Sequence, residues 1–284
     1  MINRIAVLLT VFNRKKQTIL CLESLFRQEI PEGYSISVFL TDDGCTDGTT
    51  QAVLQQFPSK VNIIQGDGNL FWNRGMWTAW NIAAKEYDYD FYLWLNDDTV
   101  LMEGALARLL VSSRAYGDRA IIVGSTVDTE THEILTYGGR GVDGSIPSCE
   151  GQDVEVDHFN GNIVLIPRTV YISLGNLDYY FTHSKGDFDY GMRARKAGIK
   201  MFQCGEILGE CDAHPVTDKW CDPRLPLSTR WKCLKRPNGM PPNESFHLNL
   251  KHYGLLSAIK VFFSIYLRCL CPQIWVKAGK MVIK

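Results

Sequence analysis

The sequence of 284 residues predicts an α/β protein whose central sheet is mostly parallel and flanked by helices. Three observations support this fold class. Short apolar runs have the length of buried strands, helical patterns separate these runs, and clusters of Gly, Asp and Asn lie at the junctions. Strands that alternate with helices through four units favour right-handed crossovers and therefore a parallel sheet.

The expected elements follow in order along the chain. Residues 5–11 form a continuous apolar run, as in a strand that is covered on both faces. The next strands are expected at residues 35–40, 61–64 and 91–95, with helical patterns around 19–26, 53–57 and 72–85. Further along we expect a helix at 104–116, a strand at 120–126, short hairpins over 127–157, strands at 163–166 and 201–208, and a helix at 187–197.

Acidic residues end two of the predicted strands. Asp42 and Asp43 follow the second strand, and Asn96-Asp97-Asp98 follows the fourth. Ligands bind at this end of the strands in open α/β sheets, so these side chains are expected to converge there. Their oxygens suit Mg²⁺ or Mn²⁺ holding a substrate diphosphate. The alternative is that Asp97 or Asp98 caps the helix that begins near Glu103.

The glycine-rich nucleotide-binding motifs are missing. Gly66-Asp67-Gly68 lacks the third glycine of the dinucleotide fingerprint, and the sequence has no GxxxxGK[ST] loop. A nucleotide site must therefore use side chains and a metal ion.

Three motifs together resemble family 2 of the inverting glycosyltransferases, which have the GT-A fold. They are Thr10-Val11-Phe12-Asn13-Arg14, Asp42 to Thr49, and Asn96-Asp97-Asp98. The resemblance extends to about residue 215, so we expect a nucleotide-sugar-binding and catalytic domain at residues 1–218. A basic C-terminal extension with helical and irregular segments would occupy residues 219–284.

The resemblance also implies roles for individual residues. Asp98 stands at the metal ligand of the DxD motif, in which Asn96 replaces the first carboxylate. Trp80 stands where many members carry an arginine that contacts the diphosphate. The implied nucleotide-binding residues are Thr10, Phe12, Arg14, Asp42, Asp43, Asn69, Asn73, Asn96 and Asp97.

A second acidic cluster resembles the family's ED motif, with Gly186 in place of the glutamate. Asp187 is then the expected general base, since an ionised aspartate can take a proton from a sugar hydroxyl. The alternative is that Asp187 only caps the following helix. The sugar and acceptor pocket is expected to include Trp72, Asn160, Gly161 and Asp189.

His214 follows the predicted strand at 201–208 and is a further candidate metal ligand. A lone histidine is more often a structural or surface residue, and that alternative stays open.

The net charge of −1 hides an asymmetry along the chain. Residues 219–284 hold twelve Lys/Arg and two Asp/Glu, a net charge of +10, which leaves −11 for residues 1–218. Such a basic region indicates an anionic partner. Nucleic acid is not expected, because no binding motif accompanies the charge.

Residues 251–284 include an apolar helical stripe from Leu255 to Trp275 with flanking lysines. We expect this helix to lie at the interface of a membrane, beside a lipid-linked acceptor. Packing of the helix on the domain is the alternative. Among the basic residues before it, Lys235 or Arg236 is a candidate to neutralise the leaving group, although either side chain could equally belong to a solvated surface.

The nine cysteines show no CxxC pair, which favours a reduced, cytoplasmic setting. No secretory signal and no membrane-spanning stretch is expected. The chain is therefore expected to be cytoplasmic and peripheral at the inner face of the cell membrane.

The sequence thus predicts an inverting, metal-dependent glycosyltransferase that moves a sugar from a nucleotide-diphosphate sugar to a hydroxyl of a glycan or lipid-linked acceptor, in surface-polysaccharide assembly of the bacterial type. One alternative is a sugar-phosphate nucleotidyltransferase, but residues 12–16 lack the glycine-rich loop that such enzymes carry. Another is a catalytically impaired nucleotide-sugar-binding protein, with Gly186 marking the loss of the motif.

Overall fold

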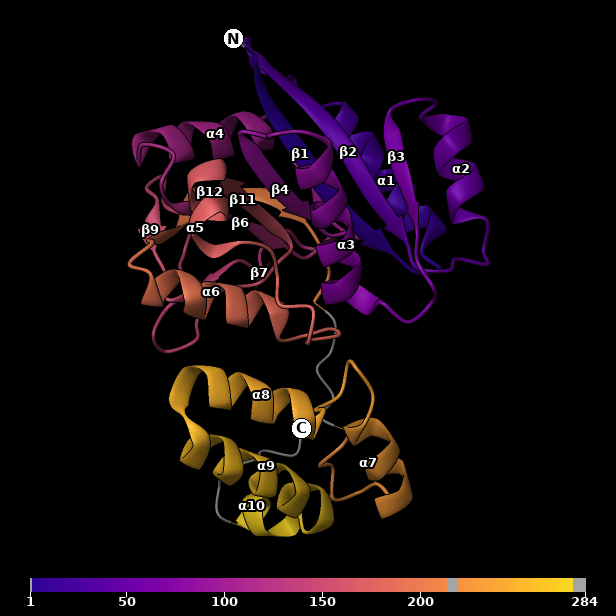
Figure 1. Ribbon diagram of the computed structural model, residues 1–284, viewed down its shortest axis with the longest axis vertical. Coiled ribbons are helices and arrows are strands. Elements are labelled where there is room, and N and C mark those ends of the chain that lie inside the picture. Colours follow the sequence, from indigo (N-terminus) through magenta and orange to yellow (C-terminus); the bar gives the residue numbers. More distant parts are fainter. Residues whose placement is uncertain (1, 214–218, 278–284) are drawn as a thin grey trace. The chain divides into compact units, whose positions relative to one another are not determined.

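The computed structural model describes residues 2–213 and 219–277, and the chain divides into two compact units (Figure 1). The first unit comprises residues 1–179 and 186–213. The second comprises residues 180–185 and 214–284. The short segment 180–185 therefore belongs with the C-terminal helices rather than with the sheet.

Among the described residues, the first unit is built on a ten-stranded sheet whose main path has the order β3-β2-β1-β4-β11-β6-β12-β5. The four strands that open the chain are mutually parallel, as the alternation of strands and helices predicts. Their bounds are β1 Asn3–Val11, β2 Tyr34–Asp42, β3 Val61–Gln65 and β4 Phe91–Leu95.

The second half of the sheet adds antiparallel strands. β11 runs antiparallel between β4 and β6, whereas β12 is parallel to β6. The strands are β5 Val100–Leu101, β6 Ile121–Val127, β7 Leu135–Tyr137, β9 Val154–Glu155, β11 Ile163–Pro167 and β12 Met201–Glu210. A separate pair is formed by β8 Gly139–Arg140 and β10 His158–Phe159. The predicted fold class is confirmed: the sheet is mostly parallel and includes some antiparallel strands.

Helices cover both faces of the sheet, because side chains alternate along each strand. Ile5, Val7 and Leu9 of β1 face one layer, and Ala6 and Leu8 face the other. The first layer contains α1 Lys15–Phe26, α2 Thr49–Gln56 and α4 Ala105–Ala115. The second contains α3 Phe71–Glu86, α5 Arg168–Leu174 and α6 Gly186–Lys196.

Trp80 of α3 lies at the centre of an aromatic cluster in the second layer. Its ring is fully buried, with ring centroids of Tyr92, Trp94, Tyr171 and Tyr190 between 5.2 and 5.6 Å away. Trp80, which the resemblance aligns with an arginine in many family members, is therefore part of the hydrophobic core in this chain.

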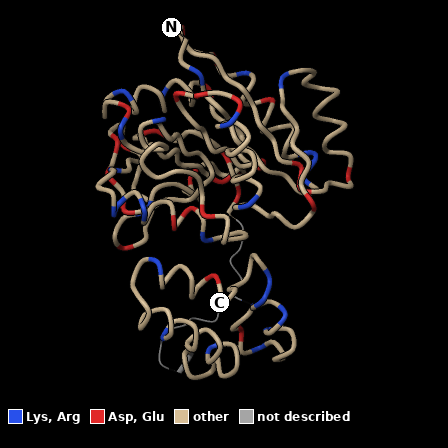
Figure 2. Tube along the Cα trace, viewed as in Figure 1, with Lys and Arg blue, Asp and Glu red and all other residues tan. Residues whose placement is uncertain are grey.

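The second unit is helical in its described part, with α7 Leu227–Leu234, α8 Pro242–Tyr253, α9 Leu255–Leu270 and α10 Gln273–Lys277. Its small core is formed by Trp220, Cys221, Leu234, Ile265 and Cys269. Lys and Arg are scattered over these helices with few acidic residues among them (Figure 2). In the described ranges, none of the helices has both the length and the apolar character needed to span a bilayer.

Candidate functional site

The candidate site lies where β1, β2 and β4 end at one edge of the sheet. Thr10 of β1 pairs with Thr41 of β2, and Leu8 pairs with Trp94 of β4, so these parallel strands end side by side. The segment Asn96-Asp97-Asp98 begins immediately after β4. The acidic residues after β2 and β4 therefore lie at the same edge of the sheet, as predicted.

Asp42 and Asp43 are buried and bound by protein donors. The carboxylate of Asp42 accepts from the backbone N–H of Cys45 at 2.6 Å and from the hydroxyl of Thr50. The carboxylate of Asp43 accepts from the backbone N–H groups of Gly68, Leu70 and Phe71 at 2.9, 3.1 and 2.9 Å, respectively. The two carboxylates thus fix the loops that follow β2 and β3, and these loops form one rim of the site.

The other residues near this rim differ in accessibility. Thr10 is buried beneath α3, where a Cβ on Gly75 would lie 2.1 Å from the Thr10 hydroxyl oxygen. Phe12 has 53% of its surface exposed directly after β1, and Asn69 is exposed in the loop before α3. Phe12 and Asn69 are therefore accessible to a ligand, whereas the side chain of Thr10 is covered by α3.

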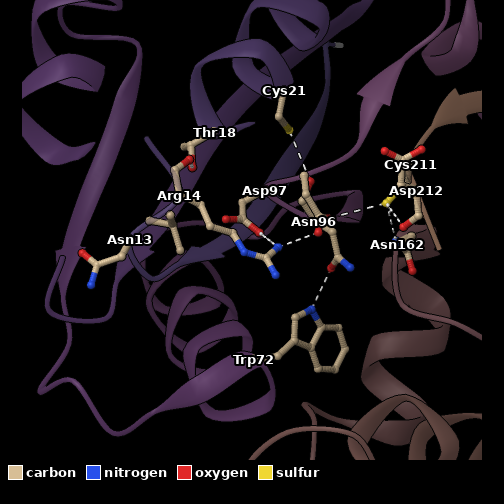
Figure 3. Close-up of polar contacts among 12 residues, drawn as sticks. Asn13, Arg14, Thr18, Cys21, Trp72, Asn96, Asp97, Asn162, Cys211 and Asp212 are labelled. Carbon is tan, nitrogen blue, oxygen red and sulfur yellow. Dashed lines mark hydrogen bonds and ion pairs between the residues drawn. The ribbon is translucent and has the colours of Figure 1, made fainter. Parts of the chain in front are cut away.

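Arg14 binds both carboxylates that follow β4 (Figure 3). Its Nη1 lies 2.5 Å from Asp98 Oδ2 and 3.3 Å from Asp97 Oδ1. Burial raises the pKa of Asp97 to about 7, while Arg14 acts in the opposite direction and Asp98 adds to the increase. The second oxygen of Asp97, Oδ2, is buried and has no hydrogen-bond partner among the described residues.

Two thiols donate hydrogen bonds to this acidic segment (Figure 3). Cys21 of α1 donates to the carbonyl of Asn96 at 3.3 Å, and Cys211 donates to Asp98 at 3.7 Å. Burial, with Asp98 as the next cause, raises the pKa of Cys211 to about 12, so the thiol stays protonated and can donate. Sequence reasoning missed both cysteines. Their isolated positions gave no signal of this role, which requires the packed fold.

Trp72 links the acidic segment to the opposite side of the site. Its indole N–H donates to the side-chain oxygen of Asn96 at 2.7 Å (Figure 3). Its ring lies against Gly161, where a Cβ would be 2.5 Å from the ring carbon Cζ2. Only glycine lets the backbone come this close to the indole ring, so the packing of Trp72 requires glycine at position 161.

Asp187 is half-buried in the first turn of α6, and the backbone N–H of Gly161 hydrogen-bonds its carboxylate. The N–H of Phe188 also donates to it, at 2.9 Å. Burial raises the pKa of Asp187 to about 7, and the two N–H groups offset part of the increase. Asp187 is therefore joined to Asn96 through Gly161 and Trp72.

Gly186, which the resemblance places at the glutamate of the ED motif, is closely packed in the structure. A Cβ on Gly186 would lie 1.6 Å from Asn73 Oδ1, so a larger residue at this position would force the side chain of Asn73 to move. Asn73 is buried in α3 and donates its amide N–H to the carbonyl of Asp178 at 2.8 Å. Asn73, predicted to contact the nucleotide, thus packs α3 against the start of α6.

Two other predicted pocket residues are held by arginines. The fully buried carboxylate of Asp189 accepts from Arg193 at 2.8 Å, and Arg193 also donates to backbone carbonyls, which anchors α6. Asn160 accepts two N–H groups of Arg140 at 3.1 and 2.9 Å. Sequence reasoning did not identify Arg140, whose burial lowers its pKa. His214, the second predicted metal ligand, lies outside the described residues.

The acidic segment has the donors that a hard divalent cation requires, but in small number. The described residues contain no group of three or more His, Cys, Asp or Glu that could hold a metal ion. Asp97 and Asp98 supply carboxylate oxygens at one point, including the unpartnered Oδ2 of Asp97. Mg²⁺ is commonly held by one or two carboxylates together with substrate phosphates, and these residues fit that pattern.

Comparisons with known proteins agree with this geometry. Residues 6–140 match the family model described as Glycosyl transferase family 2. No curated protein matches the chain. A crystal structure of S. aureus TarS residues 1–349 in complex with UDP-GlcNAc is similar over 93% of this chain and 72% of that one, with 12% identity and a TM-score of 0.56. A second crystal structure of S. aureus TarS is similar over 97% of this chain and 53% of that one, with 16% identity and a TM-score of 0.56.

Proposed function

Because residues 6–140 match the model of glycosyl transferase family 2, we propose that this protein transfers a sugar from a nucleotide-diphosphate sugar to an acceptor hydroxyl with inversion at the anomeric carbon. One observation carries the proposal. The acidic segment Asn96–Asp98 and the carboxylate of Asp187 come from distant parts of the chain, and the contacts of Trp72 and Gly161 connect them in one site.

The donor is proposed to lie along the carboxyl ends of β1, β2 and β4. Phe12 offers an exposed aromatic face for the base, and Asn69 offers an exposed amide. Arg14, whose side chain is 39% exposed, is the nearest described cation to the acidic segment and can turn toward a diphosphate. The UDP-GlcNAc in the TarS structure supports a nucleotide sugar as the class of donor.

Asp187 is proposed as the general base. The acceptor hydroxyl gives its proton to the carboxylate, and the oxygen attacks the anomeric carbon. The bond from that carbon to the diphosphate oxygen breaks, and its electron pair leaves with the nucleoside diphosphate. A pKa of about 7 makes Asp187 a stronger base than an exposed aspartate while leaving it ionised in a useful fraction at neutral pH.

Asp98 and Asp97 are the residues that would hold Mg²⁺ or Mn²⁺. Bound there, the ion would offset the negative charge that develops on the leaving diphosphate. Arg14 already occupies oxygens of both carboxylates, so the ion must compete with the guanidinium or displace it. His214 remains a proposed additional ligand, and Lys235 or Arg236 a proposed additional neutralising group.

The acceptor is proposed to be a glycan or a lipid-linked sugar at the inner face of the cell membrane. At 100° per residue, the exposed apolar side chains of α9 fall within an arc of about 120°. They are Leu255, Leu256, Ile259, Phe263, Leu267 and Leu270, and their exposed fractions range from 39% to 85%. Lys260 and Arg268 are exposed on the same helix. A helix of this kind suits the interface of an anionic bilayer, so we propose that α9 lies there.

The proposed reaction is tested by incubating the purified chain and Mn²⁺ with a panel of nucleotide-diphosphate sugars and measuring release of the nucleoside diphosphate. We expect release with at least one donor, and its loss in Asp187→Asn. Asp157→Asn is a matched control, because Asp157 pairs with the exposed Arg195. Donor binding without release in the wild type would favour the binding-protein alternative, for which the blocked position at Gly186 is the supporting observation.

A further inference from the structure

The second unit contains a cavity of about 360 Å³ lined by residues of α8 and α9 together with Lys185. Leu248, Val261 and Ile265 form part of its apolar wall. Two cations, Lys185 and Arg268, also line it, and among the described lining residues none is acidic. A cavity of this volume is near the lower end of the usual range for small-molecule sites, about 300–1,000 Å³.

Lys185 is buried in an unusual way for a lysine. Its exposed fraction is only 8%. Burial lowers its pKa, and the carboxylate of Glu244 acts in the opposite direction. Glu244 does not line the cavity, and its Oε1 accepts the N–H and hydroxyl of Thr182 at 3.1 and 2.5 Å.

A buried ammonium is costly unless an anion or hydrogen-bond acceptors satisfy it. The cavity beside Lys185 offers space for such an anion, and Arg268 supplies a second positive charge at its wall. The rest of the wall combines the polar side chains of Ser245, Asn249 and Ser264 with a larger apolar part. A free inorganic ion would leave the apolar part of the wall without a partner. The wall therefore suits a ligand that has an anionic head and a hydrocarbon chain.

We propose that this cavity binds a phosphate monoester or diester that carries an apolar chain. The phosphate lies against Lys185 and Arg268, and the first part of the chain lies along Leu248, Val261 and Ile265. As a site for the lipid part of an acceptor this inference rests on the proposed function, but binding itself requires no sugar transfer.

The test measures binding of dodecyl phosphate to the full chain by isothermal titration calorimetry, below the concentration at which the lipid forms micelles. We expect Lys185→Met to weaken binding about tenfold, as for loss of one charge-assisted hydrogen bond. Lys251→Met is the matched control, because Lys251 is an exposed lysine of α8 that does not line the cavity. We expect this variant to bind like the wild type.

Two further arms identify the ligand and protect the test against misfolding. Inorganic phosphate is expected to bind at least tenfold more weakly than dodecyl phosphate, and equal affinity would overturn the assignment to a lipid phosphate. Arg268→Gln alters an exposed side chain and is also expected to weaken binding. It replaces Lys185→Met as the test if that variant does not fold. Unchanged affinity in Lys185→Met or, should that variant not fold, in Arg268→Gln would overturn the proposal, as would an equal loss in Lys251→Met. None of these results depends on whether the chain transfers sugar, so failure here is separate from failure of the proposed reaction.

Discussion

Gly186→Ala is predicted to destabilise the protein even though alanine is the better helix former. Replacement of glycine by alanine gains up to about 1 kcal/mol in a helix interior, and less is expected at Gly186, the first residue of α6. The added Cβ would lie 1.6 Å from Asn73 Oδ1, far inside any normal contact. Overpacking of this kind costs about 1–3 kcal/mol, so we expect a net loss of about 1–2 kcal/mol in the free energy of unfolding.

Denaturant unfolding of a double-mutant cycle tests this reasoning. Asn73→Ala removes the clashing oxygen and leaves the Cβ of residue 73 at 3.3 Å, so in that background Gly186→Ala should become neutral or stabilising. Gly191→Ala is the control in the same helix, because its Cβ would meet nothing closer than 3.5 Å. We expect it to stabilise by up to about 1 kcal/mol. Equal effects of the two glycine substitutions in the wild-type background would refute the steric explanation of Gly186.

Three other predictions concern catalysis, metal binding and the membrane. Asp187→Asn should lower kcat by about 10²–10⁴-fold; in the wild type, activity should rise with pH through about 7, because the base must lose its proton, and a flat profile would contradict this role. Arg14→Gln should tighten Mn²⁺ binding about fivefold in calorimetry, since a partly exposed ion pair worth about 1 kcal/mol no longer competes; weaker binding would show that Arg14 does not compete with the ion. Phe263→Asp should reduce co-sedimentation with anionic vesicles, whereas Ile172→Asp, an equally exposed change on α5, should not. Equal loss in both, or no loss in Phe263→Asp, would argue that α9 meets something other than a bilayer.

The edge of the sheet that carries the site could be predicted from sequence because it depends on local patterns. The apolar runs at residues 5–11 and 91–95 indicate strands by length and composition alone. Both are strands in the structure, as β1 and β4. The parallel order then follows from chain topology, and the acids after the strands must meet at one edge.

The partners of each acid could not be predicted, because they depend on contacts between distant segments. Asp43 is bound by backbone N–H groups of residues 68–71, some 25 positions away. Asp98 is bound by Arg14, whose sequence position suggests only a nucleotide contact. Likewise, Gly186 looks like a lost glutamate in the sequence, and its close packing becomes visible only where α3 brings Asn73 against α6.

The causes of the two raised pKa values suggest how the site divides its chemistry. Asp97 and Asp187 each have a pKa of about 7, and burial is the largest cause for both. Asp97 lies beside Asp98 and is countered by the guanidinium of Arg14, so its surroundings favour a cation held between two carboxylates. The pKa increase of Asp187 is countered only by backbone N–H groups, which stabilise its charge but cannot exchange for an ion. Uptake of a proton removes the buried negative charge of Asp187 and the free-energy cost that burial places on it. A general base for an acceptor hydroxyl must take up a proton in this way. The two ends of the site would thus respond to different partners, the acidic segment to a cation with its diphosphate and Asp187 to a proton.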